Sequence, residues 1–171
     1  MRTLVTVSSR HGSTGEIGQA IGDTLRASGV DVEVLTPDGV GSVEGYDAVV
    51  VGSALYMGRW MGPARDFIQA HADALRGRPV WLFASGPVTG VTDPADSAEG
   101  LKLLELVAGR EFRVFAGKLD RNGLGFTERT IVRMIKSPWG DYRPWESIRD
   151  WATSIAAAIN APAGANPAVT T

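Results

Sequence analysis

The chain has 171 residues, of which 44% are hydrophobic, and it carries a formal net charge of -2. This composition predicts a single domain with ample material for a core, and a charge so close to balance gives no reason to expect nucleic-acid binding or attraction of the whole surface to an anionic membrane. The sequence contains no cysteine, which excludes disulfide bonds, thiolate metal sites and thiol nucleophiles.

The chain begins with a predicted strand, residues 4–7, which only Met1, Arg2 and Thr3 precede. No signal peptide is recognisable before this strand. No apolar run in the chain approaches the roughly 20 residues that a membrane-spanning helix needs. We therefore expect a cytoplasmic protein.

A turn rich in hydroxyl groups and glycine follows the first strand and leads into a helical pattern. The backbone N–H groups of such a turn and the positive end of the helix converge on one position, where a phosphate can bind. The alternative is an ordinary capped helix, but a cap needs one hydroxyl group and this turn supplies several. We predict a phosphate site made of six consecutive residues: Ser9, Arg10, His11, Gly12, Ser13 and Thr14.

The glycine spacing of this turn argues against two common phosphate loops. The chain has no G-x-x-x-x-G-K-[ST] motif, and Gly12, Gly15 and Gly18 do not follow the G-x-G-x-x-G spacing of dinucleotide sites. The remaining pattern, Ser9-x-x-Gly12-x-Thr14, resembles the loop by which flavodoxins hold the monophosphate of FMN. His11 either donates to this phosphate or faces solvent.

The rest of the chain alternates between strands and helices. Strands are predicted at residues 4–7, 32–35, 48–51, 80–84 and 112–116, and helices at 17–25, 64–75, 101–107 and 145–159. Most of the strands are continuous apolar runs, as a sheet covered on both faces requires. We predict an α/β fold, a flavodoxin-like doubly wound open sheet of five parallel strands in the order 2-1-3-4-5. This domain spans residues 1–160, and a disordered tail, residues 161–171, follows it.

Ligands of such sheets bind beyond the carboxyl ends of the strands, where the strand order reverses. After the third strand, an aromatic ring and a methionine among glycines form a flat, polarizable wall that suits a tricyclic ring. The predicted contacts of this loop are Ala54, Leu55, Tyr56, Met57 and Gly58. Met61, further along, is expected to pack onto the next helix.

The loop after the fourth strand consists of small residues, which let backbone N–H groups approach the pyrimidine edge of a flavin. Its predicted contacts are Ser85, Gly86, Pro87 and Val88. The sequence has no aromatic residue between Ser85 and Asp96, where many flavodoxins cover the outer face of the ring. An uncovered ring face suits an enzyme better than a shielded electron carrier.

Four stretches of the chain carry a closer resemblance: residues 2–10, 46–58, 116–119 and 145–155. In these stretches the chain resembles the quinone-dependent protoporphyrinogen oxidase family of flavodoxin-like proteins, and the likeness extends to about residue 159. The resemblance implies an FMN enzyme that oxidises protoporphyrinogen, a reduced tetrapyrrole, and passes the electrons to a quinone or a similar acceptor.

Residues 120–143 form an insertion that the sheet does not need for closure. Apolar and aromatic side chains in residues 126–142 lie among Arg129, Arg133 and Lys136, which indicates a short basic amphipathic helix. One interpretation is an element that contacts a membrane surface weakly, faces a quinone or meets porphyrin carboxylates. The other is a solvated helix docked on the domain, or a homodimer contact. The sequence leaves both open.

No catalytic acid or base is identified, since the sequence has no recognisable Ser-His-Asp order, paired carboxylates or metal-ligand cluster. His71 is expected to be a packing or surface residue. Three hypotheses follow: an FMN-dependent oxidoreductase, a flavodoxin-type one-electron carrier, and a non-catalytic domain with a relic flavin site. The first predicts a protein that takes up FMN rather than FAD, because no adenosine site is recognisable.

Overall fold

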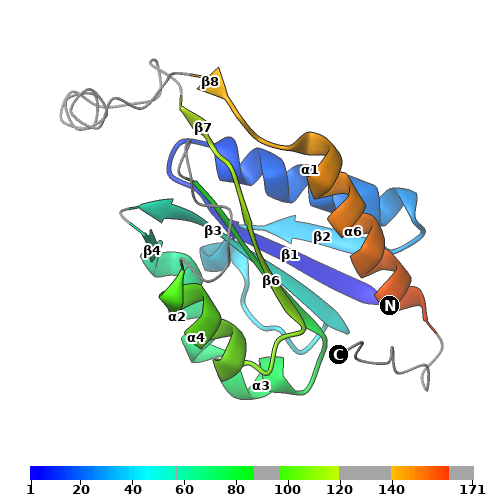
Figure 1. Ribbon diagram of the computed structural model, residues 1–171. Coiled ribbons are helices and arrows are strands. Elements are labelled where there is room, and N and C mark those ends of the chain that lie inside the picture. Colours follow the sequence, from blue (N-terminus) through cyan, green and yellow to red (C-terminus); the bar gives the residue numbers. More distant parts are fainter. Residues whose placement is uncertain (57, 87–96, 120–139, 162–171) are drawn as a thin grey trace, which may run out of the picture.

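A computed structural model describes residues 1–56, 58–86, 97–119 and 140–161 of the chain (Figure 1). Its main sheet contains five parallel strands in the order β2-β1-β3-β5-β6, which confirms the predicted order 2-1-3-4-5. The strands are β1 (Arg2–Ser8), β2 (Asp31–Leu35), β3 (Ala48–Tyr56), β5 (Val80–Ser85) and β6 (Glu111–Phe115).

Helices cover both faces of this sheet (Figure 1). One face carries α1 (Ser13–Ala27) and α6 (Trp145–Asn160), and the other carries α2 (Gly62–Ala70), α3 (Ala72–Arg76) and α4 (Ala98–Leu106). Successive side chains of β1 point to opposite faces, so Val5 belongs to the core under α1 and α6 while Leu4 belongs to the core on the other side. Burial on both faces explains the continuous apolar runs in the sequence.

The predicted helix over residues 64–75 is wrong in one respect, because the chain forms two helices there. His71 separates α2 from α3 with φ −108° and ψ 14°, outside the α-helical range. Its ring packs on Phe67 at 4.9 Å between centroids, as expected of a packing residue. With the chain redirected at this point, Ile68 and Leu75 are both fully buried.

Four short elements were not predicted. Strand β4 (Arg59–Trp60) pairs with the end of β3, and the single turn η1 (Pro37–Gly39) follows β2. Strands β7 (Lys118–Leu119) and β8 (Gly140–Asp141) pair antiparallel at the two ends of the insertion. The predicted basic helix lies outside the described residues except at 140–142, and the tail lies outside them beyond residue 161.

Candidate functional site

Four parallel strands end side by side at the carboxyl edge of the sheet. Ser8 of β1 pairs in register with Ser53 of β3, and Ala54 pairs with Ser85 of β5. Ser85 in turn pairs with Phe115 of β6. The three loops predicted to bind a ligand therefore leave the sheet at one edge, although Met57, Pro87 and Val88 lie outside the described residues.

The predicted phosphate loop, residues 9–12, connects β1 to α1. Gly12 precedes the helix with φ 82°, a left-handed conformation that favours glycine, and its carbonyl accepts the N–H of Glu16 at 2.9 Å. Gly12 occupies the N-cap position of α1 and has no side chain to cap the helix. Because first-turn N–H groups have no partner within a helix, this end can donate several hydrogen bonds to an anion.

The side chains around this helix end are small and polar. Ser9 and Ser13 are half-buried, whereas Thr14 is 3% exposed. A Cβ atom added at Gly12 would meet no atom within 4 Å, so the space beside the loop is open. The loop therefore has the open backbone and the hydroxyl groups that a phosphate monoester needs.

Arg10 and Tyr56 bring the phosphate loop into contact with the end of β3. The guanidinium carbon of Arg10 lies 5.4 Å from the centroid of the Tyr56 ring. Tyr56 is nevertheless 46% exposed, which is unusual for a large aromatic side chain at the end of a buried strand. The structure thus presents an accessible aromatic surface next to the phosphate loop.

Serine side chains of β1 and β3 hold the segment that follows Tyr56. Ser53 accepts the backbone N–H of Met61 at 2.9 Å and donates to the carbonyl of Ala54 at 2.9 Å. The Ser8 hydroxyl group donates to the sulfur atom of Met61 at 3.7 Å. Met61, predicted as a packing residue on the next helix, thus precedes α2 and also contacts the end of β1.

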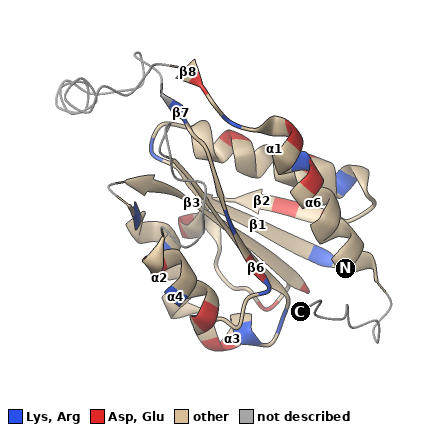
Figure 2. Cartoon of the chain, in the orientation of Figure 1, with Lys and Arg blue, Asp and Glu red and all other residues tan. Residues whose placement is uncertain are grey.

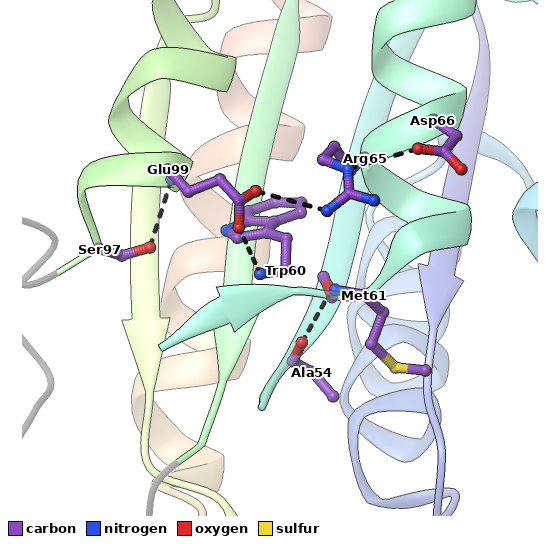
Figure 3. Close-up of polar contacts among 9 residues, drawn as sticks. Ala54, Trp60, Met61, Arg65, Asp66, Ser97 and Glu99 are labelled. Carbon is purple, nitrogen blue, oxygen red and sulfur yellow. Dashed lines mark hydrogen bonds and ion pairs between the residues drawn. The ribbon is translucent and has the colours of Figure 1, made fainter. Parts of the chain in front are cut away.

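Glu99 of α4 also holds this segment, through Trp60 (Figure 3). Its carboxylate accepts the backbone N–H of Trp60 at 2.7 Å and lies 3.7 Å from Arg65 of α2. Ser97 caps α4 just before Glu99 by accepting the N–H of Gly100 at 3.3 Å. Sequence analysis missed Glu99, because its partner Trp60 is 39 residues away and no local pattern signals the contact.

Glycines bring three strand ends into backbone contact. The N–H of Gly86 donates to the carbonyl of Phe115 at 3.1 Å. A Cβ atom at Gly86 would lie 3.2 Å from the carbonyl oxygen of Leu55, and one at Gly117 would lie 3.2 Å from the Cα atom of Gly86. Larger side chains would push these ends apart, so the small residues keep the carboxyl edge compact.

A buried arginine lies beside the phosphate loop and was also missed by sequence analysis. The side chain of Arg143 is 3% exposed and donates to Glu16 at 2.5 Å, to Asp141 at 2.6 and 2.8 Å, and to the carbonyl of Ser13 at 3.1 Å. Its guanidinium carbon lies 4.5 Å from the ring centroid of Trp145. The hydrogen bond between Arg143 and Asp141 lowers the pKa of Asp141. The same bond raises the pKa of Arg143 against the opposing effect of burial.

Membrane-spanning helices and metal-binding clusters were both looked for among the described residues. None of their helices combines the length and the apolar character needed to cross a bilayer. They also contain no group of three or more histidine, aspartate or glutamate side chains placed to hold a metal ion.

Comparison with known proteins agrees with this architecture. Residues 4–143 match the family model of a flavodoxin domain. Protoporphyrinogen IX dehydrogenase (quinone) of Escherichia coli strain K12 is 25% identical over 178 residues, which cover 95% of this chain and 98% of that protein.

Solved structures with a similar fold include a flavodoxin from the domain Archaea, with a TM-score of 0.67 and 16% identity, covering 94% of this chain and all of that one. Flavodoxin 2 from Bacillus cereus has a TM-score of 0.65 and 19% identity, covering 92% of this chain and 99% of that one. At these identities the likeness concerns the fold.

Proposed function

The chain belongs to the flavodoxin domain family, and from that premise we propose that it binds FMN at the carboxyl edge of its sheet and acts as an FMN-dependent oxidoreductase. The observation that carries this proposal is the N-terminus of α1, where Gly12 leaves the N-cap position without a capping side chain and leaves open space beside the loop. It offers backbone donors and hydroxyl groups to one phosphate monoester. FMN ends in such a group, and when bound it supplies hydride or single-electron transfer.

The described residues divide into two binding roles. Ser9, Ser13 and Thr14 would hold the phosphate together with the first-turn N–H groups of α1, and Arg10 would add positive charge. The flavin ring would lie along the exposed side of Tyr56 and near the backbone of Gly86.

We further propose that the substrate is a reduced tetrapyrrole such as protoporphyrinogen and that the acceptor is a quinone. The support is the alignment with the Escherichia coli dehydrogenase, which spans nearly the whole length of both chains. The absence of an aromatic residue between Ser85 and Asp96 agrees with a ring face left open to a substrate.

A one-electron carrier is the second candidate, because the similar solved structures are flavodoxins. Carriers of this type dock on redox proteins through a strongly charged face. Here the net charge is only -2, and basic residues lie among acidic ones on the helices (Figure 2). The charge distribution therefore favours an enzyme.

The test of this proposal is anaerobic mixing of the FMN-loaded protein with protoporphyrinogen. We expect the yellow absorption of FMN to bleach and to return when a quinone is added, over several turnovers. Heat-denatured protein with the same amount of FMN controls for reactions of free flavin. If protoporphyrinogen leaves the FMN oxidised while a redox protein exchanges single electrons with it, the carrier assignment replaces the oxidase.

A further inference from the structure

We infer that Arg143, at the C-terminal end of the insertion, is a positioning residue for the phosphate loop. It forms an ion pair with Glu16 and donates to the backbone carbonyl of Ser13. The inference deepens the proposed function and rests on it. Arg143 lies 130 residues from Ser13 and 127 from Glu16, so the contact joins two distant parts of the chain.

The surroundings of Arg143 show that the contact is built into the fold. The guanidinium group is bound by two carboxylates and a backbone carbonyl, and it stacks on Trp145, with almost no solvent contact. For comparison, Arg26 at the other end of α1 also pairs with a carboxylate and a carbonyl, but its side chain is 40% exposed. Burying an arginine is costly unless all its charge is compensated, and here Glu16 and Asp141 compensate it.

Without a partner, the negative charge of Glu16 would oppose the binding of a phosphate at the N-terminus of α1. Glu16 lies in the first turn of α1, where a carboxylate stabilises the helix but also shares the helix end with the proposed phosphate. Charges closer than about 8 Å are weakly screened at physiological ionic strength. An unpaired Glu16 would therefore repel a bound phosphate dianion, and the ion pair with Arg143 weakens that repulsion, although the Glu16 side chain is 58% exposed.

Arg143 also connects the phosphate loop to the insertion. Asp141, which holds the guanidinium group, belongs to β8, and β8 pairs with β7 at the ends of the insertion. The next residue, Tyr142, donates its N–H to the carbonyl of Gly117 at 3.2 Å. Arg143 and Asp141 thus join the phosphate loop to the paired ends of the insertion.

The test compares FMN with riboflavin, which has the same ring and no phosphate. We expect Arg143→Gln to weaken FMN binding by at least about tenfold, measured by quenching of flavin fluorescence, with riboflavin binding changed by less than about twofold. Arg143→Lys keeps the charge and should lose less affinity for FMN than Arg143→Gln. Arg26→Gln, on the same helix, is the matched control and should leave both affinities unchanged.

Glu16→Gln provides a second test, and as a single variant it does not depend on the folding of an Arg143 variant. Alone, it should bind FMN at least as tightly as the wild type, and combined with Arg143→Gln it should recover most of the lost affinity. Equal losses of FMN and riboflavin affinity in Arg143→Gln, or no recovery in the double variant, overturn the inference. A wild-type protein that binds neither flavin overturns the proposed function, and the inference falls with it.

Discussion

Replacing Ser9 with alanine and Thr14 with valine together is expected to weaken FMN binding by at least about a hundredfold. Each substitution removes one hydroxyl hydrogen bond to a charged phosphate, which contributes about 1.5 to 3 kcal/mol, and a tenfold change in affinity corresponds to about 1.4 kcal/mol. Thr14 is buried, and valine keeps its shape, so the loop should keep its conformation. The measurement is isothermal titration calorimetry with FMN.

The matched control for this double variant is Ser28→Ala, at the opposite end of α1 from the phosphate loop. Ser28 is exposed, and its hydroxyl group donates to the carbonyl of Thr24. We expect it to bind FMN as the wild type does. Unchanged FMN affinity in the Ser9 and Thr14 double variant would show that the phosphate binds elsewhere.

Replacing Trp151 with alanine is expected to lower the free energy of unfolding by about 3 to 5 kcal/mol. Trp151 is a fully buried residue of α6 that faces the sheet, with its ring centroid 6.1 Å from that of Phe83 and 5.6 Å from that of Phe115. Its indole N–H also donates to Glu111 at 2.8 Å. The truncation removes this bond and leaves a cavity between α6 and the sheet.

Urea unfolding measures this loss, and Leu101→Ala is the control. Leu101 is an exposed apolar residue of α4, so its truncation should change the free energy of unfolding by less than about 0.5 kcal/mol. Similar losses for Trp151→Ala and Leu101→Ala would contradict the described packing of α6 on the sheet.

The strands and the phosphate loop could be predicted from sequence because their signals are local. A buried parallel strand must be apolar along its whole length, as in residues 48–51, and a glycine turn between strand and helix indicates an anion site wherever it occurs. The strand order followed from the resemblance to flavodoxins, which ties it to this alternation of elements.

The supports of the site could not be predicted, because they are contacts between distant residues. Nothing in the sequence near Glu99 indicates that it accepts the N–H of Trp60, and nothing near Arg143 indicates a partner on α1. Glutamate and arginine are common on protein surfaces, and only the folded chain brings each of these two residues to its partner. The break at His71 was missed for a related reason, since the apolar spacing continues unchanged across it.

Titration of the purified, flavin-free protein with FMN, FAD and riboflavin tests the central claim most directly. We expect one FMN to bind per chain, with an affinity above that for riboflavin, because riboflavin has no phosphate to engage the loop. FAD should bind more weakly than FMN, because no adenosine site is recognisable in the sequence. Absence of FMN binding, or equal affinities for FMN and riboflavin, would contradict an FMN phosphate site at the N-terminus of α1.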